Sequence, residues 1–255
     1  MQTQLKPAVA LCIAFAGARI ESSATTAITS KGAAMAIISG KFGGSENITG
    51  TSGDDTIFPF TGFDLIDGGG GLDTVSAAFS RGNVAFLKRS GLTVMELVSG
   101  ASSANTEWRL KNVERVSFDD GAVALDLTPT QAAGKAALLI GAAAGAATLK
   151  DQLTTGAVIR YFDSGASLLD GATALVNSGI IASFAGGSDN TSFVNLVYRN
   201  LFDALPSTAV AAELASLLDN NTYTQASMLA AIAGLQANQD HIQLVGLQTS
   251  GLYFL

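Results

Sequence analysis

Three nine-residue units follow one another without a gap: GTSGDDTIF (50–58), PFTGFDLID (59–67) and GGGGLDTVS (68–76). A glycine, a carboxylate and a β-branched apolar residue recur at the same place in each unit. The recurring positions are Gly53, Gly62 and Gly71, then Asp55, Asp64 and Asp73, and then Ile57, Ile66 and Val75. A fixed short period of turn, carboxylate and β-branched residue is typical of a parallel β-roll, in which the chain winds coil upon coil.

The chemistry of one unit favours a cation in its turn. Glycines permit the positive-φ turns in which backbone carbonyls converge, and the aspartate adds a hard anionic oxygen, the ligand type that Ca²⁺ prefers. The residues after each aspartate form a short strand with one inward apolar side chain. Because two units make one coil, we expect Asp55 and Asp73 to stack on one edge and to share an ion between coils. Asp64 then lies on the opposite edge.

A degenerate fourth unit supplies a partner for Asp64. The segment KFGGSENIT (41–49) aligns in register, with Glu46 at the carboxylate position and Ile48 at the apolar one. Glu46 and Asp64 therefore predict a second ion site. Two further acids, Asp54 and Asp67, either ligate or only lie nearby.

The units resemble the calcium-binding nonapeptides of RTX (hemolysin-type) proteins. For a roll this short, the resemblance implies about two or three Ca²⁺ ions. The alternative interpretation is a set of ordinary Asp-Gly turns in a β-rich protein, because both residue types favour turns anyway. The sequence also departs from the family pattern: Phe58-Pro59-Phe60 replaces the Gly-Gly expected in the second unit, so that turn is weaker or reshaped.

Two half-buried antiparallel strands are expected after the repeats, at 80–87 and 92–98, with a turn at Gly91. The following segment, WRLKNVERVSFDDGAVALD (108–126), resembles the segment that closes the roll in repeat-bearing secreted proteins. That resemblance implies that Asp119 or Asp120 adds oxygens to the last ion. The alternative is that Asp119-Asp120-Gly121 is only a hairpin tip.

The composition changes at Thr128-Pro129, where Ala, Leu and Gly begin to dominate and the spacing becomes helical. We expect a helix over 131–147, interrupted around Gly141 and Gly145. Pro206 with Ser207 begins another over 209–218, and Thr224 begins a third over 225–236. An i, i+3, i+4, i+8 pattern predicts another from Phe193. Residues 190–250 resemble the DUF4214 helical domain, which often accompanies these repeats in extracellular bacterial proteins.

The predicted fold class is therefore α+β: a short parallel β-roll with calcium-binding nonapeptide turns and an antiparallel hairpin, followed by an α-helical domain. The predicted domains are an apolar N-terminal arm (1–40), a calcium-binding β module (41–127) and a DUF4214-like helical domain (128–255).

Charge and export signals suggest an extracellular protein. Lys plus Arg is 14 against 21 Asp plus Glu, so nucleic acid and anionic membranes are unfavourable partners. Weak extracellular-type sites, with Kd of ~10⁻⁴ to 10⁻³ M, would fill only outside the cell. The RTX resemblance implies type I secretion through an uncleaved C-terminal signal, although 1–18 could pass for a short signal peptide. No transmembrane segment is expected, and the lone Cys12 excludes an intrachain disulfide.

No catalytic constellation surrounds His241, the only histidine, so we do not expect an enzyme. Only 14% of the residues are charged, against about 25% in average domains, which favours self-association. The arm could add to a neighbour's sheet or cap its own roll. The expected function is an extracellular, calcium-stabilised structural protein that forms a cell-surface fibre, layer or matrix with copies of itself, in contact with the cell surface or other matrix components. The alternative is a monomeric secreted adhesion or carbohydrate-binding module.

Overall fold

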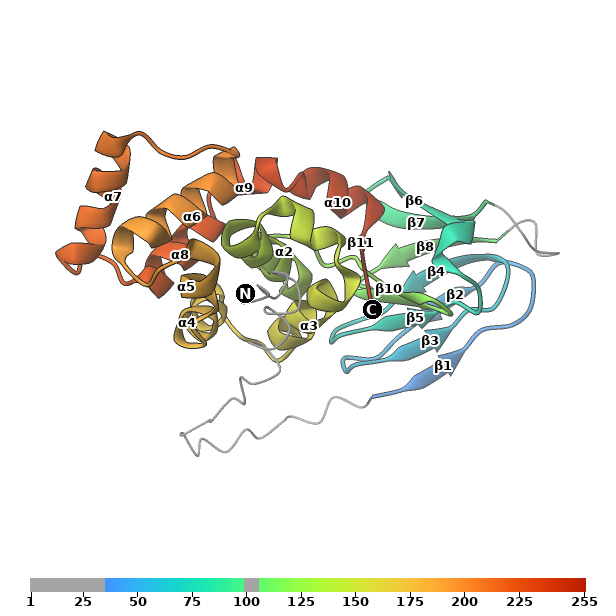
Figure 1. Cartoon of the computed structure of the whole chain (residues 1–255). Coiled ribbons are helices and arrows are strands. Elements are labelled where there is room, and N and C mark those ends of the chain that lie inside the picture. Colours follow the sequence, from blue (N-terminus) through green and yellow to red (C-terminus); the bar gives the residue numbers. More distant parts are fainter. Residues whose placement is uncertain (1–34, 99–105) are drawn as a thin grey trace, which may run out of the picture. The chain divides into compact units, whose positions relative to one another are not determined.

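The computed structural model describes residues 35–98 and 106–255. They form an α+β structure, as expected, and divide into two compact units (Figure 1). The sheet unit comprises the described residues up to 126 together with 246–255, and the helical unit comprises 127–245. Most of the expected apolar arm, 1–34, lies outside the described residues.

The sheet unit contains two mixed sheets. One has the strand order β1-β3-β5-β9-β10-β11 and the other has the order β2-β4-β8-β7-β6. The strands are β1 (Ile37–Ser39), β2 (Asn47–Thr49), β3 (Thr56–Phe58), β4 (Phe63–Asp67), β5 (Thr74–Ser76), β6 (Val84–Arg89), β7 (Leu92–Leu97), β8 (Glu107–Lys111), β9 (Arg115–Phe118), β10 (Gly121–Ala124) and β11 (Leu252–Phe254).

Successive strands of the repeats alternate between the two sheets, so each pairs with the strand two units away. In the parallel pair β2–β4, Ile48 lies opposite Ile66, and in β3–β5 Ile57 lies opposite Val75. The nine-residue period thus becomes a stack of strands in matching register. Ile38 of β1 lies opposite Ile57, so the stack begins one strand earlier than the four units, inside the expected arm.

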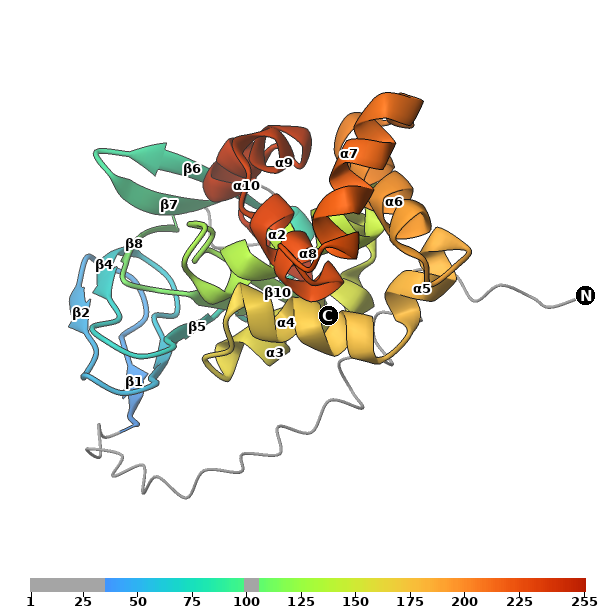
Figure 2. The same cartoon turned by 90° about the vertical axis from the view of Figure 1, so that its left-hand side faces the viewer.

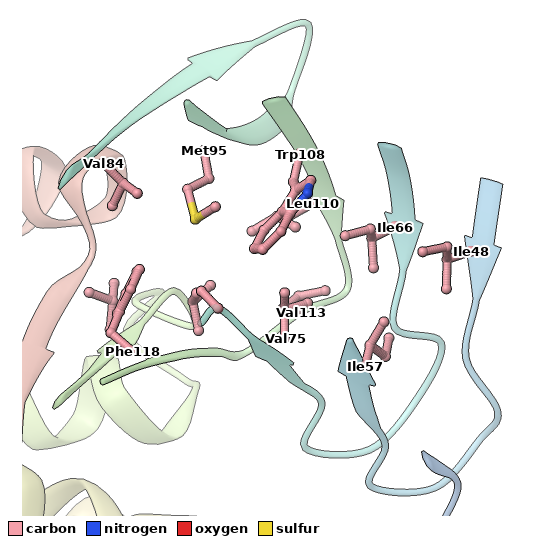
Figure 3. Packing of buried hydrophobic residues seen from close by; sticks show 13 residues of the cluster. Ile48, Ile57, Ile66, Val75, Val84, Met95, Trp108, Leu110, Val113 and Phe118 are labelled. Atoms are coloured by element: carbon pink, nitrogen blue, oxygen red, sulfur yellow. The ribbon is translucent and has the colours of Figure 1, made fainter. Parts of the chain in front are cut away.

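The β-branched residues of the repeats line the core of the sheet unit. Figure 3 shows Ile48, Ile57, Ile66 and Val75 on neighbouring strands, and the last three are fully buried. Side chains alternate between the two faces of a strand, so each three-residue strand contributes one side chain to this core. Trp108 belongs to the same cluster.

Antiparallel strands complete both sheets. The expected strand pair is β6 and β7, which meet at the turn Ser90-Gly91. On the other sheet, β10 folds back on β9 and then pairs with β11, from the C-terminal end of the chain. The sequence-based boundary placed β11 in the helical domain. It lies instead in a sheet, because Gly251 (φ +72°) ends the preceding helix and lets the backbone pair with β10.

The helical unit is built around α2, which is buried along nearly its whole length. Figure 2 shows α6 and α7 side by side, in orange. The α-helices are α2 (Ala132–Ala144), α3 (Gln152–Asp163), α4 (Leu168–Asn177), α5 (Ile180–Ala185), α6 (Asn190–Phe202), α7 (Thr208–Asp219), α8 (Gln225–Ala233), α9 (Gln236–His241) and α10 (Leu244–Ser250). The boundary between the two units falls within α10, after Val245. Short 3₁₀ helices cover Arg81–Asn83 and Ala146–Lys150. Within the described residues, none of these helices combines the length and apolarity needed to cross a membrane.

The N- and C-termini of these helices match the sequence-based prediction only in part. Ser207 and Thr224 cap α7 and α8 as expected. In contrast, α2 continues through Gly141 and ends only at Gly145 (φ +85°). Gly141 is needed for packing, because a Cβ there would lie 2.4 Å from Ile242 Cγ2.

Candidate metal-binding turns

Three acidic side chains form a ladder along one edge of the sheet unit. The Asp55 amide donates to Asp73 Oδ1 (2.8 Å), and the Asp73 amide donates to Glu114 Oε2 (2.9 Å). The Ala36 amide in turn donates to Asp55 Oδ1 (2.8 Å). Each carboxylate therefore binds the backbone of the preceding coil. Asp55 and Asp73 are together on one edge, and both are buried.

Glu114 is the member of this ladder that was not predicted. A signal for it exists in the sequence: Glu114 stands two residues before the buried Val116, the same spacing as Asp73 and Val75. The chain between 77 and 111 interrupts the nine-residue count, so the period itself does not reach Glu114. The position is instead set by the pairing of β5 with β9.

The ladder carries a negative charge without full compensation. Asp73 is 0% exposed, and its Oδ2 has no hydrogen-bond partner. Burial raises the pKa of Asp73 to about 6; the hydrogen bond from the Asp55 amide opposes this shift, and the charges of the Asp55, Asp54 and Asp67 carboxylates add to it. Burial also raises the pKa of Glu114; the hydrogen bond from the Asp73 amide opposes this shift and the charge of the Asp73 carboxylate adds to it. A buried carboxylate is costly unless a cation or hydrogen bonds compensate it, so this turn fits a cation.

Backbone carbonyls converge on the same turns. A Cβ on Gly68 would lie 2.0 Å from the Asn112 carbonyl oxygen and 2.5 Å from Asp73 Oδ2. A Cβ on Gly50 would lie 1.9 Å from the Gly68 oxygen and 2.7 Å from Asp55 Oδ2. Neutral and anionic oxygens thus crowd into space that only glycine leaves free, which is the donor set for Ca²⁺.

Side chains alone do not make a metal centre here. Over 35–98 and 106–255, no group of three or more His, Cys, Asp or Glu side chains is placed to hold a metal ion. An ion at these turns would take backbone carbonyls as well as carboxylates.

Asp54 and Asp67 lie close to this edge but have protein partners. Asp54 Oδ1 accepts from the Leu72 amide (2.8 Å). Asp67 accepts from Lys111 Nζ (2.6 Å) and Asn112 Nδ2 (2.8 Å). The hydrogen bond from Lys111 is the main reason that the pKa of Asp67 is lowered.

The opposite edge brings Glu46 and Asp64 together. The Glu46 amide donates to Asp64 Oδ1 (3.1 Å), while Asp64 Oδ2 is buried without a hydrogen-bond partner. Burial raises the pKa of Asp64, and the charge of Glu46 adds to the shift. Glu46 Oε2 accepts from the Lys41 amide (2.7 Å). The row of carboxylates on this edge has only two members, because Trp108 lies opposite Asp64 on the next strand.

Asp119 and Asp120 are not brought together with Asp73. They form the tip of the β9–β10 hairpin, at the end of β9, whereas Asp73 precedes the start of the neighbouring β5. Asp120 Oδ1 accepts from the Arg81 amide (2.8 Å), and its carbonyl accepts from the Tyr253 hydroxyl. This geometry matches the hairpin-tip alternative.

Comparison with known proteins places the chain in no family. No protein-family model matches it, and no curated protein matches its sequence.

Proposed function

We propose that the sheet unit is a short β-roll that binds Ca²⁺ and belongs to an extracellular protein of RTX-like type. The observation that carries the proposal is Asp73: a buried carboxylate with one unpartnered oxygen, in a glycine turn where carbonyl oxygens converge. Asp55, Asp73 and Glu114 would hold ions on one edge, and Glu46 and Asp64 on the other. Calcium there would screen the stacked charges and make folding depend on the millimolar Ca²⁺ outside cells.

We further propose that copies of the chain assemble into a surface fibre, layer or matrix. The support comes from the start of the stack. In the part of the chain that the structure describes, β1 and β2 are the terminal strands of their sheets. Ile37 (78% exposed) and Phe42 (77% exposed) add apolar surface beside these edges. Exposed apolar edge strands are templates for pairing with another chain.

The test is to measure the mass of the full chain by light scattering after size-exclusion chromatography, and to image it by electron microscopy, in millimolar Ca²⁺ and after chelation. We expect large assemblies in Ca²⁺ that disperse when the ion is removed. A compact monomer near 25.9 kDa in Ca²⁺ would contradict the assembly proposal. Calorimetric titration showing no Ca²⁺ binding would contradict the roll proposal.

A further inference from the structure

Two glycine turns lie on the Asp55–Asp73 edge, and they can be compared position by position. The first turn covers 50–55 and the second covers 68–73. In both, a Cβ on the opening glycine would meet a carbonyl oxygen of the next coil, at 1.9 Å in the first turn and 2.0 Å in the second. The same Cβ would lie 2.7 Å from Asp55 Oδ2 or 2.5 Å from Asp73 Oδ2. Both turns therefore place a carbonyl oxygen and a carboxylate oxygen close together.

In the first turn, protein donors already occupy both carboxylate oxygens. The Thr51 amide donates to Asp55 Oδ2, and the Thr51 hydroxyl donates to Asp55 Oδ1 (2.9 Å). The Ala36 amide also donates to Oδ1 (2.8 Å). The bond from the Thr51 amide is the main reason that the pKa of Asp55 is lowered. A cation at this turn would have to compete with these donors for a carboxylate whose charge is already compensated.

In the second turn, the corresponding amide is directed elsewhere. Gly69 stands where the first turn has Thr51, and its amide donates to Asp67 Oδ1 (3.3 Å) instead of to Asp73. Gly69 has a φ of +100°, a conformation that threonine rarely adopts. Asp67 in turn lies opposite Thr49 in the β2–β4 pair, so the first turn has no carboxylate at that place. Asp73 Oδ2 is thereby left buried and without a hydrogen-bond partner.

Asp67 is held firmly enough to keep the Gly69 amide. Its Oδ2 accepts from Lys111 Nζ (2.6 Å), and its Oδ1 also accepts from Asn112 Nδ2 (2.8 Å). Both oxygens of Asp67 thus have protein donors. A buried carboxylate oxygen without a donor gains most from a cation, so the two acids of this turn have different roles.

We propose that the two turns bind Ca²⁺ unequally. The second turn holds the tight ion through Asp73, while Thr51 closes the first turn by satisfying Asp55. Asp67 is a positioning residue: it keeps Asp73 open by holding the Gly69 amide. This inference rests on the calcium-binding function proposed above, and it adds the distribution of ions along the edge and the residues that decide it.

Two substitutions of Asp67 separate positioning from charge. Asp67→Ala releases the Gly69 amide, which can then close the turn on Asp73 as Thr51 does on Asp55. We expect the tight Ca²⁺ affinity of the full chain, measured by calorimetric titration, to fall about tenfold or more. Asp67→Asn removes the same charge but keeps an oxygen that accepts from Gly69, so its affinity should stay within about threefold of wild type.

Counting bound ions tests the inequality directly. By native mass spectrometry of the full chain in Ca²⁺, Asp73→Asn should lose one ion, whereas Asp55→Asn should keep the wild-type count. The double variant Thr49→Asp, Thr51→Gly gives the first turn the residues of the second turn at these places, and it should gain one ion. Adding Asp55→Asn to the double variant should restore the wild-type count.

The outcomes separate this inference from the calcium proposal. Loss of one ion in both Asp55→Asn and Asp73→Asn, or an unchanged count in the double variant, overturns the inequality but leaves calcium binding intact. Equal weakening by Asp67→Ala and Asp67→Asn overturns the positioning role. Circular dichroism checks that each variant folds, and the Asp67 pair tests the inference even if Asp55→Asn does not fold. If the wild-type chain binds no Ca²⁺, both proposals fail.

Discussion

At the scale of the residue, Asp73 is the side chain on which the proposed function most depends. Its Oδ1 accepts an amide hydrogen bond, but its buried Oδ2 has no partner. Without a cation the buried charge of this carboxylate opposes folding, and under the proposed function the same carboxylate would be a ligand of the ion. The same group therefore gives opposite contributions to stability in the two conditions.

Replacing Asp73 by Asn tests this double role. In metal-free buffer at neutral pH we expect Asp73→Asn to raise the free energy of unfolding by about 1–3 kcal/mol, because a buried charge is removed. In millimolar Ca²⁺ the variant should lose about 2 kcal/mol of calcium-dependent stabilisation. Urea titrations with and without Ca²⁺ measure both effects. Asp240→Asn, an exposed site in the helical unit, is the control, and a variant less stable than wild type in metal-free buffer would contradict this view.

The raised pKa of Asp73 also predicts a pH dependence. A carboxyl whose pKa is higher in the folded protein stabilises it below the unfolded value of 3.8, and that contribution is lost as pH rises through about 6. Asp64 and Glu114 shift in the same direction. The pKa values of Asp55 and Asp67 are lowered, so these two carboxylates stabilise the folded protein above about pH 4, and that contribution is lost as the pH falls below this value.

We therefore expect the metal-free chain to lose stability between pH 4 and pH 6. Urea midpoints over this interval measure the slope, and Asp73→Asn should flatten it. A metal-free protein that gains stability over the same interval would show that the buried carboxylates are compensated in some other way.

At the scale of the element, the turn before β5 determines whether two coils can approach. Its four consecutive glycines are not equivalent. A Cβ on Gly68 would lie 2.0 Å from a backbone carbonyl oxygen, whereas a Cβ on Gly70 would have its nearest neighbour at 3.8 Å. The close approach therefore depends on Gly68, and Gly70 has room for a methyl group.

Gly68→Ala and Gly70→Ala form a matched pair for this turn. We expect Gly68→Ala to destabilise the sheet unit by about 3 kcal/mol or more and to weaken Ca²⁺ binding, because the backbone must move away from the ion's oxygens. Gly70→Ala should change stability by no more than about 1 kcal/mol. Calorimetric unfolding and Ca²⁺ titration of both variants provide the measurement. Equal losses of stability in Gly68→Ala and Gly70→Ala would contradict the special role of Gly68 and show that the whole glycine run can shift to accept a methyl group.

Elements were predictable where one local signal dominated. The recurring β-branched residue after each aspartate predicted the strands β3, β4 and β5, and Ser207 and Thr224 marked the starts of α7 and α8. The helices α3 to α5 were not predicted. Helix α5 is only six residues long. Helix α3 contains Thr154, Thr155 and Gly156, residues of modest helix propensity that become helical here through burial.

At the scale of the whole molecule, the sheet unit is closed by residues far apart in the chain. Strand β11 pairs with β10 more than a hundred residues earlier, and buries Leu252 and Phe254. The Tyr253 hydroxyl donates to the Asp120 carbonyl. The C-terminal residues are thus part of the fold of the sheet unit.

Deleting residues 252–255 should therefore destabilise the sheet unit. Loss of two buried apolar side chains predicts a decrease of about 4 kcal/mol in its free energy of unfolding, together with a newly exposed edge on β10. Calorimetry in Ca²⁺ should show a lower transition temperature. Deleting Leu255 alone, which is outside β11, is the control. An unchanged transition after removal of 252–255 would mean that β11 contributes little.

The sequence by itself determined the repeat, the pairing of alternate units and the edges on which Asp55, Asp64 and Asp73 lie. A nine-residue period is a local property of a winding chain, so it can be read without knowing which distant strands pair. Only the tertiary structure decided that Glu114 continues the ladder, that Trp108 ends the other one and that the C-terminus supplies β11. These three depend on which distant strands pair. Such pairing is selected by burial and backbone hydrogen bonding across the whole unit, and no local spacing encodes it.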